Sequence, residues 1–218
     1  MWVEVYFMVY AAIVFDFDGV ILESTEVKSA AFHDLALPWG KAAADWMLEY
    51  HLAHFGVSRF LKFEWFFQNV LGREISPEES AALSDRFTAL CLEKILEAPF
   101  VPGFSETLAQ AGERFPLYVA SATPQKELEQ ILELRGLQDC FQKVYGAPCK
   151  KSEVLLEIAA ALGAEPQELL MVGDSPWDLA AAKEAGTAFY GRGARFQDSG
   201  YLWGEDLHNL AACLAAPA

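Results

Sequence analysis

AAIVFDFDGVILES, residues 11–24, is the stretch from which the fold of this chain can be inferred. Its apolar run, residues 11–15, has no polar alternation, which is typical of a strand buried on both faces. Asp16 and Asp18 follow at the carboxyl end of that strand, where ligands bind in open α/β sheets, and Gly19 permits a sharp turn. Two carboxylates this close repel each other unless a cation or a shared proton lies between them. The stretch therefore predicts a divalent-metal site with a nucleophile, and an acidic turn without catalytic function is the alternative.

The composition is that of a globular protein with a strong acidic excess. Of the 218 residues, 53% are hydrophobic and 13% are aromatic, which is enough for a substantial core. The formal net charge of -15 argues against binding to nucleic acid or to an anionic membrane surface, because both need a basic face. A phosphate-bearing substrate stays compatible with this charge if a metal and a few basic residues gather at one site.

The cysteines and the first residues bear on the cellular compartment. The four cysteines form no CxxC pair and no zinc spacing, which favours free thiols in a reducing environment. The apolar residues 1–15 lack the basic region and the cleavage site of a secretion signal, and they are too few to span a bilayer. We therefore expect a cytoplasmic protein, in which residues 2–10 form an additional strand or an extended start.

Between residues 24 and 98 the sequence pattern predicts helices alone. Helical stretches at 24–36, 41–55 and 58–71 precede a fourth one, which begins at Ser76-Pro77-Glu78-Glu79. Ser76 is expected to cap that helix and Glu79 to complete a capping box. The fourth helix should end before Pro99, so the sequence predicts an all-helical insertion directly after the first strand.

From Val101 onward, short apolar strands alternate with helices. Strands are predicted at 116–120, 143–145, 169–172 and 187–190. Helices are predicted at 103–113, 123–135, 151–162, 176–185 and 205–215. This alternation predicts a parallel sheet wrapped on both faces, and right-handed crossovers make it a Rossmann-like three-layer α/β core.

Polar side chains stand at the ends of four predicted strands. They are Asp16 and Asp18, then Ser121, then Lys150 or Lys151, then Asp174. Because the carboxyl ends of parallel strands meet at one edge, we expect these side chains to converge. Each has an ordinary structural alternative: Ser121 could bind local backbone groups, Asp178 could be the capping-box carboxylate of the helix after Ser175, and the lysines could be solvated. Four separate coincidences are a weaker explanation than one shared site.

The motif DFDGV (16–20), followed by a Ser after an apolar strand, a Lys and GDSPWDLAAAKEAG (173–186), resembles the haloacid dehalogenase-like hydrolase superfamily. The resemblance is to its phosphoglycolate phosphatase and β-phosphoglucomutase group, and it covers the chain beyond about Ala11. It implies a core domain of residues 1–22 and 99–218 and a helical cap domain of residues 23–98. It also implies a phosphatase that uses Mg²⁺ and an aspartyl-phosphate intermediate on a small phosphorylated metabolite. A phosphosugar mutase and a C–P hydrolase of the phosphonoacetaldehyde hydrolase kind are the alternatives.

The resemblance implies a role for each carboxylate. Asp16 is the nucleophile. Asp18 is the general acid and base, and its backbone carbonyl helps to hold Mg²⁺; proximity to Asp16 and partial burial are expected to raise its pKa. Asp174 ligates Mg²⁺, and Asp178 supports the metal directly or through water. Mg²⁺ prefers oxygen ligands and uses few carboxylates, which agrees with this set.

The resemblance also implies how the phosphoryl group is bound. Ser121 donates a hydrogen bond to it, Ala122 lies beside it, and Lys151 neutralises its charge. Many relatives carry Lys-Pro-x-Pro where this chain has GAPCKKSE, residues 146–153, so Lys150 is the alternative to Lys151. Glu23 is a second departure, because many relatives have Asp before the Ser at the hinge to the cap.

We expect the cap to close over the site and its side chains to determine which substrate binds. Arg59 and Lys62 lie three residues apart in FGVSRFLKF, residues 55–63, so they share one helical face. We expect this pair, with His51 or His54, to bind an anionic part of the substrate; a solvated helix flank is the alternative.

The C–P hydrolase alternative requires a cap lysine that forms an imine, for which Lys28, Lys41 and Lys62 are candidates. The expected partner is a small phosphorylated substrate, with no nucleic acid and no membrane. The expected assembly is a monomer or a weak homodimer.

Overall fold

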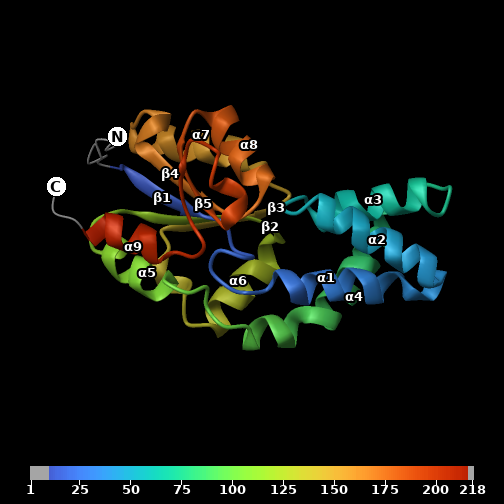
Figure 1. The fold of residues 1–218 in the computed structure, drawn as a ribbon. Coiled ribbons are helices and arrows are strands. Elements are labelled where there is room, and N and C mark those ends of the chain that lie inside the picture. Colours follow the sequence, from blue (N-terminus) through green and yellow to red (C-terminus); the bar gives the residue numbers. More distant parts are fainter. Residues whose placement is uncertain (1–9, 216–218) are drawn as a thin grey trace.

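The protein is described here by a computed structural model that covers residues 10–215, so the expected strand at residues 2–10 lies outside the described residues except for Tyr10. One parallel sheet organises the fold (Figure 1). Its strands are β1 (Ala12–Phe15), β2 (Leu117–Pro124), β3 (Lys143–Ala147), β4 (Leu169–Gly173), β5 (Ala188–Arg192) and β6 (Leu202–Gly204). They lie in the order β3-β2-β1-β4-β5-β6 and every pair is parallel. The predicted α/β class and Rossmann-like sheet are confirmed.

The central strand β1 sets the position of the site. Val14 pairs with Tyr118 of β2 on one side and with Met171 of β4 on the other. The strand order turns back beside β1, since β2 and β3 lie on one side and β4 to β6 on the other. Ligands of open α/β sheets bind at such a switch point, outside the carboxyl ends of the strands. The residues that follow β1 and β4 therefore face the same crevice.

Helices cover both faces of the sheet, as the unbroken apolar run of β1 requires. α7 (Lys151–Leu162) and α8 (Pro176–Ala185) cover one face, and α5 (Phe104–Gly112), α6 (Gln125–Leu134) and α9 (His208–Ala215) cover the other (Figure 1). Ala12 and Val14 pack toward the first group, and Ile13 and Phe15 toward the second. All four side chains are fully buried, and full burial of a large apolar side chain stabilises a fold by about 1.5–3 kcal/mol.

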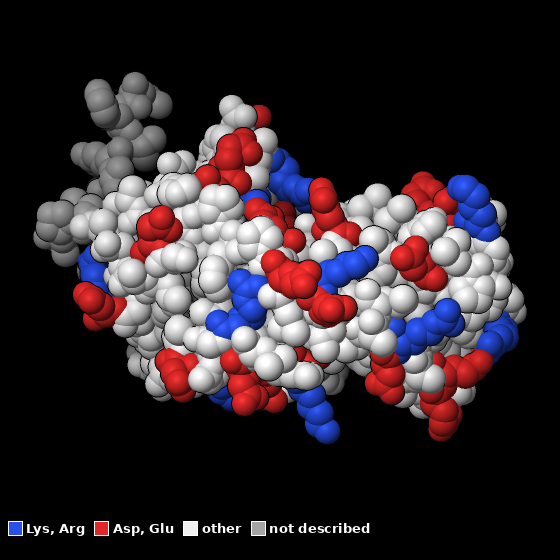
Figure 2. Space-filling view, turned by 90° about the horizontal axis from the view of Figure 1, so that it is seen from below, with Lys and Arg blue, Asp and Glu red and all other residues white. Residues whose placement is uncertain are grey.

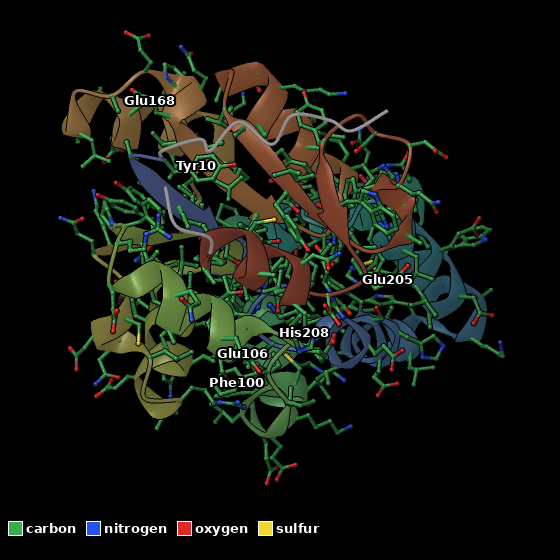
Figure 3. All side chains as sticks on the ribbon, turned by 60° about the vertical axis from the view of Figure 1, so that its left-hand side comes forward. Tyr10, Phe100, Glu106, Glu168, Glu205 and His208 are labelled. Atoms are coloured by element: carbon green, nitrogen blue, oxygen red, sulfur yellow. The ribbon has the colours of Figure 1, made fainter. Side chains whose placement is uncertain are left out.

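The start of β1 and the last described helix are tied into this core. The N–H of Ala11 donates to the carbonyl oxygen of Glu168 at 2.7 Å, which anchors the entry of β1 to that of β4. α9 packs beside α5, and His208 and Glu106 lie near each other where these helices meet (Figure 3). The last described helix thus closes one face of the sheet.

The helical insertion extends from the carboxyl edge of the sheet (Figure 1). It contains α1 (Thr25–Ala36), α2 (Lys41–Ala53), α3 (Arg59–Asn69) and α4 (Pro77–Glu97). The predicted capping box of α4 is present, because Ser76 Oγ accepts the N–H of Glu79 at 3.2 Å and the Glu79 carboxylate accepts the N–H of Ser76 at 3.1 Å. Buried aromatic side chains such as Phe32, Phe63 and Phe87 pack these helices together. The division into a core of residues 1–22 and 99–218 and a cap of residues 23–98 stays a prediction.

Several predicted boundaries were wrong. β2 continues to Pro124, where the prediction ended the strand before Ser121 and began a helix at 123, because pairing with β3 extends to Ala147. β6 was missed, since its three residues carry too short a pattern to recognise. Short 3₁₀ turns also occur at Leu37–Trp39, Gln138–Cys140, Pro166–Glu168 and Ala194–Phe196.

The surface carries the acidic excess of the composition. Figure 2 shows acidic side chains over both parts of the molecule, and on this face the described Lys and Arg residues are scattered rather than joined into a patch. Within residues 10–215, no helix is both long and apolar enough to cross a membrane.

Candidate active site

Asp16 directly follows β1 at the sheet edge, and its side chain is 6% exposed. Its Oδ1 accepts the N–H of Phe17 at 2.7 Å and lies 2.8 Å from the ammonium of Lys151. Among the described residues, none donates a hydrogen bond to Oδ2. Burial raises the pKa of Asp16 to about 7, since the nearby carboxylates add to the effect of burial and the attraction of Lys151 compensates for it only in part. A buried carboxylate with one open oxygen is suited to attack an electrophile or to bind a cation.

Lys151 is the first residue of α7, the helix that follows β3. Its ammonium contacts Asp16 and also donates to Asp178 Oδ1 at 2.5 Å. Burial alone would lower the pKa of Lys151, but the two carboxylates outweigh it and raise that pKa above its usual range. The lysine therefore stays cationic beside Asp16.

Lys150, the sequence alternative, points elsewhere. Its ammonium pairs with the exposed Glu184 of α8, and both side chains are 55% exposed. Lys150 lines a neighbouring groove of about 700 Å³ between α7, α8 and the segment before α3. The structure thus brings Lys151, and not Lys150, to the carboxylate cluster.

Asp18 is held by three side chains. Its Oδ1 accepts the hydroxyl of Ser24 at 2.6 Å, and its Oδ2 accepts Lys28 Nζ at 2.5 Å and the hydroxyl of Thr123 at 3.0 Å. Burial raises the pKa of Asp18, but the charge of Lys28 and these hydrogen bonds outweigh burial, so the pKa lies below its usual value. The expectation of a raised pKa was wrong, because sequence spacing does not show that a lysine ten residues later returns to this carboxylate.

The three partners of Asp18 went unrecognised in this role. Ser24 precedes α1 as expected, but it makes no side-chain cap, since its hydroxyl is committed to Asp18. Lys28 lies one helical turn after Ser24, and this i, i+4 spacing was the available signal. Thr123 belongs to the part of β2 that was predicted to be helix.

Asp174 follows β4 and completes an acidic cluster. One carboxylate oxygen from each of Asp16, Asp174 and Asp178 lies within 4.8 Å of the other two. Burial and the charges of Asp16 and Asp178 raise the pKa of Asp174 well above its usual value. The part of the chain that the structure describes donates no hydrogen bond to the Asp174 carboxylate. A Cβ on Gly19 would come within 2.2 Å of Asp174 Oδ2, so only glycine allows this close approach.

Asp178 forms the predicted capping box and also contacts Lys151. Its Oδ2 accepts the N–H of Ser175 at 3.0 Å and the Ser175 hydroxyl at 2.6 Å, which forms the capping box of α8. Its Oδ1 is occupied by Lys151, so the fully buried Asp178 also positions that lysine. Because both oxygens are engaged, we expect Asp178 to support a cation through water.

Ser121 and Ala122 lie at the same edge, on β2. The Ser121 side chain is 1% exposed, and its Oγ accepts the N–H of Thr123 at 3.1 Å. This local bond is the structural alternative foreseen for Ser121, and it leaves the hydroxyl proton available for a ligand. Both residues line a cavity that also reaches Asp16, Asp18 and Asp174.

The cavity lies between the sheet edge and the helical insertion and has a volume of about 60 Å³. The helical wall includes Lys28, His51, Arg59 and Lys62. His54 is turned away, with its Nδ1 against the carbonyl oxygen of Tyr50 at 2.8 Å.

Arg59 is already neutralised. Its guanidinium donates to both oxygens of Glu127 on α6, at 2.8 and 2.6 Å, and to the hydroxyl of Thr88 at 2.9 Å. Arg59 and Glu127 are 4% and 7% exposed, so this is a buried ion pair between the insertion and the core. The solvated flank is contradicted for Arg59, yet Arg59 has little capacity left for a substrate anion.

A side chain of β5 holds the turn that follows Asp18. Arg192 donates to both carboxylate oxygens of Glu23, at 2.9 and 2.5 Å, and to the carbonyl oxygen of Gly19 at 2.9 Å. Glu23, the residue that departs from the family pattern, therefore has a structural partner at the junction between core and insertion.

Comparison with known proteins agrees with this geometry. Residues 10–186 match a protein family described as haloacid dehalogenase-like hydrolase. The phosphoglycolate phosphatase of Pasteurella multocida is 30% identical over 200 residues, which cover 81% of this chain and 83% of that protein. The phosphoglycolate phosphatase of Synechococcus elongatus is 27% identical over 80% of each chain.

A solved structure, the β-phosphoglucomutase of Clostridium difficile, superposes with a TM-score of 0.75 at 22% identity, covering 92% of this chain and 93% of that one. At this identity the similarity concerns the fold. The resemblance inferred from DFDGV and GDSPWDLAAAKEAG is confirmed.

Proposed function

The chain belongs to the haloacid dehalogenase-like hydrolase family, and we propose that it is a Mg²⁺-dependent phosphatase that cleaves a small phosphate monoester through an aspartyl-phosphate at Asp16. One observation carries the proposal: a buried carboxylate with an open oxygen lies 2.8 Å from a buried lysine and beside a carboxylate that lacks a described hydrogen-bond donor. Relatives named phosphoglycolate phosphatase support the same reaction class.

In the first step, a carboxylate oxygen of Asp16 attacks phosphorus and the bond between phosphorus and the ester oxygen breaks, so that the leaving oxygen takes up a proton. In the second step, water attacks the phosphorus of the aspartyl-phosphate, which releases phosphate and restores Asp16. The ammonium of Lys151 and the hydroxyl of Ser121 are placed to stabilise the charge that spreads over the phosphoryl oxygens.

Asp18 is the proposed proton carrier. Its contact with Lys28 keeps it ionised, which suits removal of a proton from the attacking water. The same contact opposes donation of a proton to the leaving oxygen. Lys28 must therefore separate from Asp18 before the first step, and movement of α1 relative to the core would achieve this.

The acidic cluster fits Mg²⁺. Asp16, the carbonyl of Asp18 and Asp174 would supply oxygen ligands, Asp178 would act through water, and the close approach of three carboxylates favours a cation between them. Bound there, Mg²⁺ would offset the negative charge of the substrate and the transition state.

Hydrolysis of a small ester is preferred over a phosphosugar mutase because relatives that align over about 80% of their length are named phosphoglycolate phosphatase. A requirement for a bisphosphate primer would reverse this choice.

A C–P hydrolase is favoured by one observation alone, the position of Lys62 in the cavity wall. Lys28 is bound to Asp18, and Lys41 is 81% exposed beside Asp45, so neither is suited to form an imine in the cavity. Borohydride treatment in the presence of an aldehyde phosphonate would trap such an imine on Lys62.

The phosphatase proposal is tested by phosphate release from a panel of monoesters with and without Mg²⁺, for the wild type, Asp16→Asn and the surface control Lys94→Met. Activity that needs the metal, is lost in Asp16→Asn and persists in Lys94→Met supports it. Equal activity of Asp16→Asn and the wild type would contradict it.

A further inference from the structure

The cations around the cavity differ in how they are compensated. Lys151 is paired with Asp16 and Asp178, Lys28 with Asp18, and Arg59 with Glu127. Within residues 10–215, Lys62 makes no salt bridge, although its side chain lines the cavity and only 2% of the residue is exposed. A buried ammonium without a counter-charge is costly, so this position calls for an anion that comes from outside the chain.

Among the residues that the structure describes, the hydrogen-bond partner of Lys62 is His51, whose Nδ1 lies 2.8 Å from Lys62 Nζ. The proton on His51 can be assigned from its neighbours. Ser29 donates its hydroxyl proton to the carbonyl oxygen of Thr25 at 2.8 Å, so Ser29 Oγ must accept from His51 Nε2 at 3.1 Å. Nδ1 is then the unprotonated nitrogen and accepts from Lys62.

His51 is consequently neutral and orients Lys62 without neutralising it. Burial and the charges of Lys62 and Lys28 lower the pKa of His51 to about 2, which agrees with this tautomer. The face of the Phe32 ring lies 4.9 Å from Lys62 Nζ and restricts it further. Lys62 has three N–H bonds, and His51 uses one of them.

We propose that Lys62, oriented by His51, binds a carboxylate on the leaving group of the substrate, so that the substrate is the phosphate ester of a short hydroxy acid. This inference rests on the proposed phosphatase function. It also revises the expectation that Arg59 and Lys62 act as a pair, because Arg59 is bound by Glu127.

The charge balance of the cavity wall selects among anions. Lys28 and Arg59 are already paired with Asp18 and Glu127, so among the described residues the wall offers one uncompensated positive charge, at Lys62. One positive charge balances the single negative charge of a carboxylate, whereas a phosphate dianion would leave a negative charge uncompensated in this buried wall.

The electrostatics of the empty cavity are consistent with such a receptor. The charged groups that face Lys62 are Lys28, Arg59 and Asp18, while His51 is neutral. Burial, Lys28 and Arg59 lower the pKa of Lys62 to about 7, and Asp18 compensates for this only in part. A bound carboxylate would raise the pKa again, so substrate and proton should bind together.

The first experiment compares phosphoglycolate with ethyl phosphate, two esters of similar length that differ in the carboxylate. We expect the wild type to prefer phosphoglycolate in kcat/KM by roughly 10–100-fold, the range of one charge-assisted hydrogen bond. Lys62→Met should bring this ratio close to one, and the matched control Lys94→Met, an exposed lysine of α4, should keep the wild-type ratio. A preserved ratio in Lys62→Met would overturn the proposal.

The second experiment uses the wild type, so it decides the question even if Lys62→Met does not fold. Above about pH 7 the KM for phosphoglycolate should rise by about tenfold per pH unit, because binding then requires uptake of a proton. The KM for ethyl phosphate should not follow. Parallel KM profiles for the two esters, or an imine on Lys62 trapped by borohydride, would overturn the proposal.

The two hypotheses fail differently. If neither ester is hydrolysed by the wild type with Mg²⁺, or if Asp16→Asn is as active as the wild type, the phosphatase function fails and the receptor falls with it. If both esters are hydrolysed at similar kcat/KM, the phosphatase stands and only the role of Lys62 is refuted.

Discussion

The sheet edge and the helical wall face each other across one cavity, yet their charged residues are organised in different ways. At the sheet edge, three carboxylates crowd together and Lys151 is the cation that compensates for part of their charge. In the helical wall, cations predominate, and Lys62 lacks an acidic partner among the described residues. The edge is therefore short of positive charge and the wall is short of negative charge, which is the polarity expected of a site that binds a metal on one side and a substrate anion on the other.

Arg59 and Lys62 of α3 show that the charge balance of a cavity wall cannot be read from sequence spacing. Arg59 and Lys62 share a helical face and line the same cavity. Arg59 is nevertheless neutralised by Glu127, sixty-eight residues later, whereas the described hydrogen-bond partner of Lys62 is a neutral histidine. Whether a cation is available for a ligand depends on partners from distant segments.

The largest effect expected at the sheet edge is loss of turnover in Asp16→Asn. Removal of a covalent nucleophile typically costs a factor on the order of 10⁴–10⁶ in kcat. Single-turnover phosphate release measures it, with circular dichroism to show that the fold persists. Without Mg²⁺ the variant should also melt at a higher temperature than the wild type, because one charge of the crowded cluster is gone; a lower melting temperature would argue against that crowding.

The buried pair between wall and core should control stability more than substrate choice. Arg59→Met leaves Glu127 buried and unpaired, and breaking such a pair costs about 3–5 kcal/mol of unfolding free energy. The double variant Arg59→Met, Glu127→Leu should recover most of that loss, since no charge is left alone. Urea unfolding of both variants measures the cycle.

The contrast with Lys62 is sharpest if ester preference is recorded in the same variants. The ratio of phosphoglycolate to ethyl phosphate turnover should change far more in Lys62→Met than in Arg59→Met. An equal loss of preference in both would remove the distinction drawn between these two cations.

The crowded carboxylates of the sheet edge should also make the stability of the protein depend on pH. Asp16 and Asp174 have folded-state pKa values raised above the ordinary value of 3.8, to about 7 for Asp16, so these two groups bind more protons in the folded protein than in the unfolded chain between about pH 4 and pH 7. His51, whose pKa is lowered to about 2, opposes them by one proton below about pH 6.5, and Lys62, whose pKa is lowered to about 7, favours the folded protein at higher pH. Stability without metal should therefore fall as the pH rises from about 4 to 7 and should no longer fall above that. Mg²⁺ should stabilise the protein most at the upper end. Melting temperatures from pH 4 to pH 8 test this, and a rise in stability over this range in the metal-free protein would contradict the raised pKa values.

The smallest effect is expected at Lys150. Its pair with Glu184 is exposed, so Lys150→Met should leave kcat/KM within about twofold of the wild type and hardly change the melting temperature. Lys151→Met, in comparison, should abolish turnover. Similar losses in the two variants would show that the lysines have been assigned wrongly.

The sheet edge could be predicted because its residues follow apolar strands that are readable in sequence. Asp16, Asp174 and Lys151 each stand at the end of a strand or the start of a helix, so the parallel topology alone brings them together. The same logic failed for β6, whose three residues carry no pattern, and for the end of β2, where Thr123 was assigned to a helix.

The surroundings of Asp18 and of the helical wall could not be predicted in the same way. The direction of the Asp18 pKa depends on Lys28 and Thr123, which come from two different segments. The choice between Arg59 and Lys62 depends on Glu127 and on the tautomer of His51. These are tertiary contacts between polar side chains, which hydrophobic periodicity does not encode.

The central claim is that Asp16 takes up the phosphoryl group. The most direct measurement is a rapid acid quench of the wild-type enzyme during turnover of phosphoglycolate with Mg²⁺, followed by mass spectrometry of the peptide that contains residues 11–24. We predict the mass of one added phosphoryl group on Asp16, absent in Asp16→Asn. Full turnover with no phosphorylated peptide at any quench time, together with inversion rather than retention of configuration at phosphorus, would contradict the account.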